Sequence, residues 1–348
     1  MSFKTAHITV GRPSEETANG VLQTVYNLVS APECLEDCRS LYMSNSLASG
    51  PINSKAYGLG ILDAVKLARD IIGIHDLARI YYYGGCQWRN WLIFILVKLL
   101  RKDVCRHVLV PSGAYSEQSQ KRRSIAKQLI VRTIEVRINA FFDFMQALSE
   151  QERTHIIALN KGFSSERVVV IPNIIASSVS KIKSDFKTGD FQMLFLGRKD
   201  FEYKGLKQTI QAVDMLNTSG VNITLNIYGS ECSSEDQEAL QNAVNATSGN
   251  VHEFGPVFGE AKSRVLANHD FFILASRSEG LPTALIEAAQ SGLKCFATKE
   301  TNLDGSDFDA GVVEVKGDAC SIAAALKKYI LKPSADENFQ MRHFRQRY

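Results

Sequence analysis

Two glutamates with seven residues between them flank the start of a predicted helix. The segment reads SRSEGLPTALIE, with Glu279 before the helix and Glu287 inside it, and it follows the apolar run Phe271–Leu274. Pro282 favours a helix start here, because the first turn of a helix does not use the N–H that proline lacks. In an open α/β sheet, ligands bind where a strand leads into a helix, and the free N–H groups of that helix suit a diphosphate. Both carboxylates can then reach ligand hydroxyls; the alternative is that Glu279 only caps the helix and Glu287 only contacts solvent.

Two cations follow another apolar run. Arg198 and Lys204 lie in the segment LGRKDFEYKG, directly after the predicted strand Gln192–Leu196. Cations at the end of a strand can bind a diphosphate and stabilise the negative charge that develops on a departing nucleotide. The alternative is a polar loop with both side chains in solvent, and the two glutamates downstream favour the phosphate site.

Short apolar runs alternate with helical patterns along the chain, which predicts a parallel α/β architecture. The predicted strands of the first half are 5–10, 40–44, 78–83, 106–110, 142–148 and 167–171, and its clearest helices are 19–29, 62–72 and 118–139. The second half is predicted to have strands at 192–196, 223–228, 251–254 and 271–274, short strands near 295 and 313, and helices at 204–216, 234–244, 260–267, 282–290 and 318–330.

The chain length predicts two domains. At about 100–200 residues per domain, 348 residues are enough for two units with cores of their own. The stretch 176–190 is polar and has no apolar periodicity, which is typical of a linker. We therefore expect an N-terminal Rossmann-like domain at 1–175, a linker at 176–190 and a C-terminal Rossmann-like domain at 191–348.

Six segments, taken in order, resemble motifs of one enzyme family. They are ALSEQE around Glu150, VIPN ending at Asn173, LGRKDFEYKG, IYG ending at Gly229, EFGPV ending at Val257, and the segment with the two glutamates. The chain resembles the family-four retaining glycosyltransferases of the GT-B fold, whose signature is a pair of glutamates at this spacing. The resemblance implies two tandem Rossmann-like, doubly wound parallel-sheet domains with a cleft between them. It also implies that the second domain binds a nucleotide-sugar donor and the first an acceptor.

The resemblance implies roles for individual residues of the second domain. Arg198 and Lys204 match the cations that bind the donor diphosphate, and Glu279 matches the residue that contacts the transferred sugar; these three are the expected catalytic residues. Glu287 matches the residue that holds the ribose hydroxyls, and the backbone at Val257 matches the position that contacts the nucleobase edge. The remaining expected substrate-binding residues of this domain are Gly280, Leu281, Pro282 and Thr283.

The sequence of the first domain predicts fewer site residues. Asn19 and Gly20 match a loop in which the backbone approaches the diphosphate, and a glycine permits such contact because it has no side chain; an ordinary turn is the alternative. Many relatives carry a histidine after the fourth strand of this domain, where this chain has Ser112 and Gly113. No general base is therefore predicted in this domain, which agrees with retaining transfer in which the acceptor proton passes to the donor phosphate.

The resemblance predicts a retaining glycosyltransferase that moves a hexose or N-acetylhexosamine from a nucleotide sugar, with UDP favoured, to a glycan acceptor. A lipid-diphosphate-linked acceptor in surface polysaccharide synthesis (O-antigen, lipopolysaccharide or capsule) fits this family. One alternative is a nucleotide-sugar 2-epimerase of the same fold, which would keep a histidine in the cleft. Another is a non-catalytic partner subunit, which would be expected to lose Arg198, Lys204 or Glu279. A dehydrogenase is disfavoured because no G-x-G-x-x-G follows the first strand.

No cofactor and no divalent metal are predicted. The seven histidines are scattered, and none pair at the spacing of metal ligands. Asp307 and Asp309 form an Asp-x-Asp, but it falls in a predicted loop and not at a strand end.

Positive charge is concentrated in the first domain. Residues 1–175 contain 21 Lys and Arg against 15 Asp and Glu, and residues 87–137 contain 11 against 3. Such a region can face nucleic acid, an anionic membrane or a phosphorylated acceptor. Nucleic acid is not predicted, because the chain has no zinc knuckle and no aromatic RNA-binding strand.

The basic region contains two helix-like segments, and we predict a different environment for each. The stretch 88–99 is apolar on all sides, which predicts burial. The helix at 118–139 would present its cations to an anionic membrane, and a solvated charged face is the alternative. The N-terminus does not resemble a signal peptide, and the longest apolar run is shorter than the ~20 residues that cross a bilayer. We therefore expect a cytoplasmic protein, peripheral on the inner face of the cytoplasmic membrane.

Overall fold

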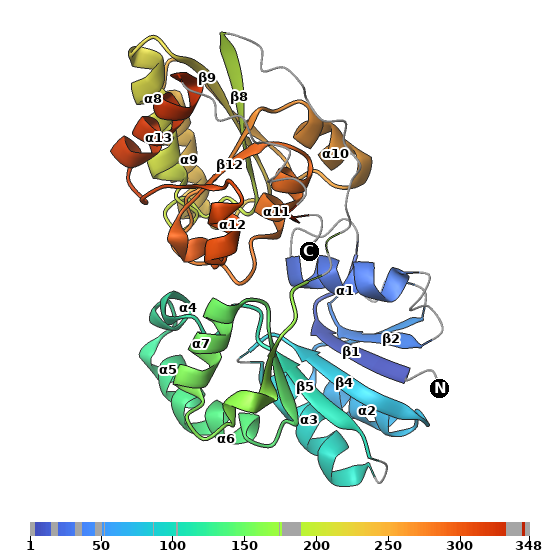
Figure 1. Ribbon diagram of the computed structural model, residues 1–348. Helices are drawn as coiled ribbons and strands as arrows, with labels where there is room; N and C mark the ends of the chain where they lie inside the picture. Colours follow the sequence, from blue (N-terminus) through green and yellow to red (C-terminus); the bar gives the residue numbers. More distant parts are fainter. Residues whose placement is uncertain are drawn as a thin grey trace. The chain divides into compact units, whose positions relative to one another are not determined.

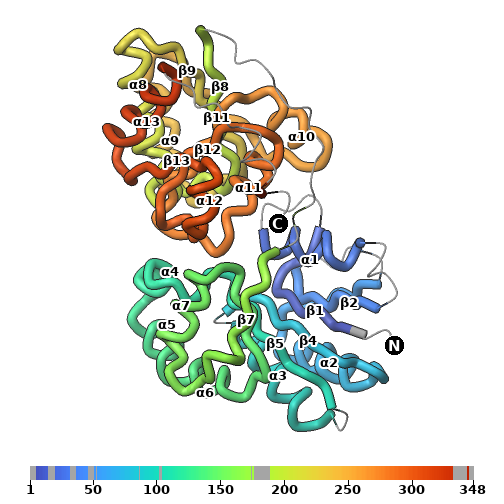
Figure 2. The backbone as a smooth tube through the Cα atoms, in the orientation of Figure 1, coloured from blue at the N-terminus to red at the C-terminus, as the bar shows by residue number. Residues whose placement is uncertain are grey.

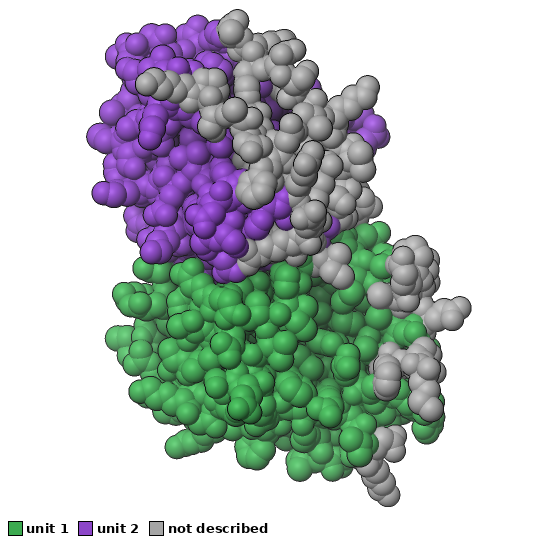
Figure 3. Space-filling model, in the orientation of Figure 1, with its two compact units in different colours: residues 1–174 green, residues 175–348 purple. Residues whose placement is uncertain are grey.

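The chain divides into two compact units, residues 1–174 (unit 1) and residues 175–348 (unit 2) (Figure 3). The computed structural model describes residues 4–14, 20–31, 37–45, 51, 53–85, 87–101, 104–173, 175, 189–331 and 343–344. Each unit contains a parallel sheet of its own with helices packed against it, as the ribbon and the backbone trace show (Figures 1 and 2).

Unit 1 has a seven-stranded parallel sheet in the order β3-β2-β1-β4-β5-β6-β7. The strands are β1 Lys4–Val10, β2 Cys38–Met43, β3 Ser54–Tyr57, β4 Leu77–Tyr83, β5 Arg106–Val110, β6 Phe144–Ala147 and β7 Val168–Val170. Strand β3 is not predicted from the sequence. It has four residues and pairs only with β2 at the sheet edge, so it needs no apolar run to be stable there.

The core of unit 1 lies between one face of this sheet and the helices α2 (Ile61–Ile72) and α3 (Trp88–Leu100). Tyr82 of β4 packs edge-on against Phe94 of α3 and Phe142, and these two phenylalanine rings stack with centroids 4.0 Å apart. The unit also contains α1 (Gly20–Ser30) and α7 (Glu150–Leu159).

The prediction that the apolar stretch 88–99 is buried on all sides is wrong. Ile93, Phe94 and Val97 of α3 are buried, but Leu99 is 76% exposed and Leu100 61% exposed. Helix α3 contacts the sheet and α2 along one side, so the apolar side chains on its other side contact solvent.

The single helix predicted at 118–139 is interrupted. It consists of α4 (Glu117–Lys121), α5 (Ile125–Ile130), a π-helical turn (Val131–Glu135) and α6 (Val136–Asn139). The Ser124 hydroxyl accepts a hydrogen bond from the backbone N–H of Lys127 and so caps a new helix. A serine inside a helical pattern offers the backbone this alternative, which periodicity alone does not reveal.

Unit 2 has a six-stranded parallel sheet in the order β10-β9-β8-β11-β12-β13. The strands are β8 Asp190–Leu196, β9 Asn222–Tyr228, β10 Val251–Phe254, β11 Phe271–Leu274, β12 Lys294–Ala297 and β13 Val313–Glu314. All four residues of β11 are buried, which explains the apolar run that precedes the glutamates. The strand order reverses between β8 and β11, and in doubly wound sheets this reversal is the switch point where ligands bind.

Six α-helices of unit 2 lie in the described residues: α8 Leu206–Thr218, α9 Ser234–Asn245, α10 Gly259–Ala267, α11 Thr283–Gln290, α12 Gly305–Asp309 and α13 Ala319–Leu331. Residues 176–188 of the predicted linker lie outside the described residues. Asp190, the last residue of that predicted linker, is instead the first of β8, because its backbone continues the ladder with Asn222 of β9. Within the described ranges, no helix has the length and apolar character needed to cross a membrane.

Candidate active site

The loops after β8 and β11 meet at the switch point of unit 2, because the two strands are hydrogen-bonded neighbours. Gly205 ends the first loop with a φ of 68°, and a side chain there would collide with the carbonyl oxygen of Ala275, directly after β11. Glycine satisfies both the left-handed backbone and the close approach. The Arg277 N–H also donates to the Tyr203 carbonyl at 2.9 Å. These contacts bring the cationic loop against the loop that carries Glu279.

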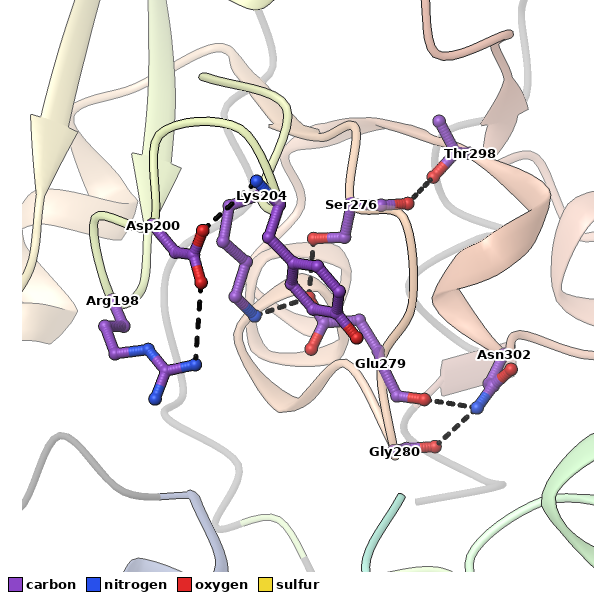
Figure 4. Close-up of polar contacts among 9 residues, drawn as sticks. Arg198, Asp200, Lys204, Ser276, Glu279, Gly280, Thr298 and Asn302 are labelled. Carbon is purple, nitrogen blue, oxygen red and sulfur yellow. Dashed lines mark hydrogen bonds and ion pairs between the residues drawn. The ribbon is translucent and has the colours of Figure 1, made fainter. Parts of the chain in front are cut away.

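Lys204 and Glu279 form an ion pair at this junction. The Lys204 Nζ lies 2.5 Å from Oε1 of Glu279, and the Ser276 hydroxyl donates to the same oxygen at 2.6 Å (Figure 4). The side chains of Lys204 and Glu279 are 16% and 13% exposed. Thr298 fixes the serine in turn, because its hydroxyl donates to the Ser276 carbonyl. The structure therefore joins two of the three predicted catalytic residues.

Asn302 holds the backbone of the glutamate loop and was not predicted. Its side-chain amide donates to the carbonyl oxygens of Glu279 and Gly280 (Figure 4). The Glu279 N–H donates to the Glu300 carbonyl, so the turn is held from both directions. Asn302 is buried and has a left-handed φ of 63°, a conformation that asparagine tolerates better than most residues.

Arg198, the third predicted catalytic residue, is not part of this ion pair. Its side chain is 53% exposed, and within the described residues its ion-pair partner is Asp200, at 4.0 Å. The next residue, Lys199, is buried and contacts Glu253 of β10 at 2.6 Å. Lys199 therefore anchors the loop and leaves Arg198 accessible to a ligand. Residue type alone does not distinguish the cations of this loop, whereas their burial and their ion-pair partners do.

Glu287 is paired with a lysine that sequence reasoning missed. It lies on α11, and its Oε1 accepts a hydrogen bond from Lys262 Nζ on α10 at 2.7 Å. The two side chains are 17% and 14% exposed. Lys262 lies five residues after Val257 in the predicted helix 260–267, and this proximity to an expected binding loop is the only sequence signal for it.

The other predicted residues of unit 2 lie around these pairs. Val257 is partly buried in the loop between β10 and α10. Leu281 and Pro282 are buried, whereas Gly280 and Thr283 are partly accessible. Helix α11 begins at Thr283, one residue later than predicted, and the Pro282 carbonyl accepts from the N–H groups of Leu285 and Ile286.

In unit 1, Gly20 is the first residue of α1, and its carbonyl accepts a hydrogen bond from the Thr24 hydroxyl. Asn19 lies outside the described residues.

The loops after β5 and β6 in unit 1 are joined by a buried carboxylate. Glu152 accepts hydrogen bonds from the N–H of Gly113 at 2.5 Å and the N–H of Leu148 at 2.7 Å. Burial raises the pKa of Glu152 to about 7, while the two N–H groups act in the opposite direction. Ser112 has a left-handed φ of 54°, so this carboxylate holds a strained turn shortly after β5.

Nothing in the described ranges resembles a metal centre, because no three His, Cys, Asp or Glu side chains lie close enough together to hold an ion.

Residues 178–344, nearly all of unit 2, match the family model described as glycosyl transferases group 1. Unit 2 belongs to the group 1 glycosyltransferases. No curated protein matches the chain in sequence. Its fold is similar to that of solved structures: HepE of Anabaena in complex with UDP (14% identity, TM-score 0.75) and sucrose-phosphate synthase of Thermosynechococcus elongatus (15%, 0.75). The apo lipopolysaccharide outer core galactosyltransferase WaaB is also similar (16%, 0.68). Each match covers 99% of this chain and 95% of the other, which confirms the predicted GT-B fold.

The geometry of unit 2 suits a glycosyltransferase that uses a nucleotide-sugar donor. Two largely buried Lys–Glu pairs follow the ends of parallel strands, and an accessible arginine stands nearby. Cations neutralise a diphosphate, and carboxylates accept hydrogen bonds from sugar hydroxyls.

Proposed function

We propose that this glycosyltransferase moves a hexose or N-acetylhexosamine from a UDP-linked donor to a glycan acceptor, with retention of configuration at the anomeric carbon. The observation that carries the proposal is the Lys204–Glu279 pair at the switch point of unit 2, with Ser276 on the same carboxylate oxygen. HepE, which has the same fold, was solved with UDP, with UDP and glucose, and with UDP-glucose, and this supports uridine as the nucleoside.

In the proposed reaction, different residues contact the diphosphate, the sugar and the nucleoside of the donor. Lys204 and the accessible Arg198 neutralise the diphosphate and stabilise the negative charge that grows on the departing nucleotide. Glu279 contacts the transferred sugar, whose anomeric carbon gains positive character in the transition state. Glu287 holds the ribose, and the backbone at Val257 contacts the nucleobase. The acceptor proton passes to the departing phosphate, so the reaction needs no general base from unit 1.

We propose that the acceptor is lipid-diphosphate-linked and that the enzyme acts in surface polysaccharide synthesis at the inner face of the cytoplasmic membrane. WaaB, of the same fold, is a lipopolysaccharide outer core galactosyltransferase, and this supports a role in surface polysaccharide synthesis. A surface of unit 1 supports the location. We call it the basic–apolar face and define it by its exposed residues: Lys121, Arg122, Ile125, Lys127, Leu129, Ile130, Arg132, Ile134, Arg137 and Phe141.

The basic–apolar face combines the two features that bind anionic bilayers. Five of its residues are cations, and the one acidic residue between Lys121 and Phe141, Glu135, is fully buried. Its apolar side chains are unusually accessible: Ile125 is 86% exposed and Phe141 68%. Cations near an anionic surface contribute about 1 kcal/mol each, and inserted apolar side chains add to this.

A donor screen followed by product analysis tests the proposal. Thermal unfolding is measured with UDP, GDP and ADP, and a nucleotide at 100 times its Kd stabilises the protein by about 2.7 kcal/mol. UDP-sugars are then supplied with lipid-linked acceptors, and NMR determines the anomeric configuration of the product. We expect stabilisation by UDP and a product that retains the donor configuration. An inverted product, or stabilisation by none of the three nucleotides, contradicts the proposal.

A further inference from the structure

Lys262 contacts the second glutamate from a helix to which the proposed chemistry assigns no role. Its Nζ lies 2.7 Å from Oε1 and 2.5 Å from Oε2 of Glu287, and the two side chains are 14% and 17% exposed. The Lys207–Glu202 pair of the same unit is, by comparison, 46% and 49% exposed. Two charges removed from water are stabilising only if their hydrogen-bonding groups are satisfied. The Lys262–Glu287 pair therefore differs from an incidental surface contact.

One oxygen of the Glu287 carboxylate is incompletely satisfied. Oε1 accepts a hydrogen bond from Lys262, whereas Oε2 is buried and, although close to the ammonium, accepts no well-directed hydrogen bond from the described residues. A buried oxygen that accepts no well-directed hydrogen bond is stabilised further by a ligand that donates one. The lysine ammonium has three N–H groups, and one of them serves Oε1. An acceptor and additional donors are thus held side by side.

This combination matches the vicinal hydroxyls of ribose. A hydroxyl both donates and accepts, so it can donate to Oε2 of Glu287 while its oxygen accepts from Lys262. We infer that Lys262 completes the ribose subsite and makes the enzyme selective for nucleotides that carry a 2′-hydroxyl. The inference rests on the proposed nucleotide-sugar donor and names the residue that distinguishes the ribose of that donor. A lysine that only neutralised Glu287 would strengthen binding of ribo- and deoxyribonucleotides alike.

Calorimetric titration with UDP and 2′-deoxyuridine 5′-diphosphate separates these two roles. We expect the parent enzyme to prefer UDP by about 10-fold or more, since a hydrogen bond to a charged group contributes about 1.5–3 kcal/mol. In Lys262→Met the preference falls to within about 3-fold, while kcat at saturating donor stays close to the parental value, because uniform binding does not change kcat. Lys207→Met, which removes an exposed lysine paired with Glu202, is the matched control and keeps the parental preference.

Each outcome decides the inference. If Lys262→Met binds both nucleotides more weakly but keeps the parental ratio of the two Kd values, the lysine is merely structural and the inference is overturned. The inference is also overturned if Lys262→Met binds both nucleotides like the parent. If Lys262→Met does not fold, Lys262→Gln, which keeps a neutral donor, replaces it, and an unchanged ratio again overturns the inference. If the parent binds neither nucleotide, the proposed function itself fails, and the parental titration reveals this before any variant is compared.

Discussion

Lys204 and Glu279 are 75 positions apart in the sequence, and their charged groups lie 2.5 Å apart. The contact forms because β8 and β11 are adjacent strands and the loop after each one carries one partner. In the proposed reaction the donor enters beside this pair, its diphosphate approaches Lys204, and its sugar approaches Glu279.

Changing Glu279 to Gln is expected to lower kcat by about 100-fold and to leave the affinity for UDP nearly unchanged. The glutamate contacts a sugar that becomes more positive in the transition state, so its contribution is largest there. UDP lacks that sugar. Steady-state kinetics and UDP titration measure the two effects. Glu202→Gln, at an exposed glutamate of the cationic loop, is the control. A parental kcat in Glu279→Gln would contradict the assigned role.

Changing Glu287 to Gln is expected to have the opposite effect on the kinetics, raising KM and not lowering kcat. A contact to ribose exists before and during the reaction alike, so its loss raises KM and leaves kcat close to the parental value. The affinity for UDP falls as well. Glu260→Gln, on the exposed side of α10, provides a matched control. If both Glu279→Gln and Glu287→Gln bind UDP and turn over like the parent, the seven-residue spacing has no functional meaning.

Asn302 is expected to act by positioning the loop of Glu279. Asn302→Gly tolerates the left-handed backbone but removes both hydrogen bonds to the carbonyls of Glu279 and Gly280. We expect kcat to fall about 10-fold, which corresponds to about 1.4 kcal/mol, with UDP affinity retained. Asn302→Asp should be more damaging, because a carboxylate would face two carbonyl oxygens. Parental kinetics in both variants would show that the loop needs no such support.

The basic–apolar face is expected to recruit anionic vesicles. Co-sedimentation should increase with the content of anionic lipid and decrease with salt. The double variant Arg122→Glu with Lys127→Glu should abolish most of it, and Lys328→Glu in unit 2 should not. Arg123 is left unchanged because its guanidinium donates to the Ala114 carbonyl and so supports the fold. Equal sedimentation of the double variant and the parent would exclude this surface.

Transfer is expected to proceed in excess EDTA, because Lys204 and Arg198 can neutralise the diphosphate without a divalent ion. Initial rates before and after chelation, and after addition of Mg²⁺ or Mn²⁺, measure the dependence. Activity that EDTA abolishes and a divalent ion restores would assign the neutralising role to a metal.

The sequence alone determined the parallel α/β class, most strands, and the position of Glu279 and Glu287 at the start of a helix. These features are local: apolar runs define strands, proline defines a helix start, and the spacing of two residues on one segment needs no partner. The same local signals failed at residues 118–139, where Ser124 interrupts a helical pattern, and in α3, where apolar side chains remain exposed.

Only the tertiary structure decided which charges meet. Arg198, Lys199 and Lys204 lie in one short loop, yet one is exposed, one anchors Glu253 and one pairs with Glu279. Lys262 and Asn302 have no distinguishing feature in the sequence, apart from the proximity of Lys262 to the expected binding loop at Val257. Their roles depend on the order of β8, β10, β11 and β12 in the sheet and on the loops that this order brings together. Strand order is a property of long-range packing, and the periodicity of a single segment does not encode it.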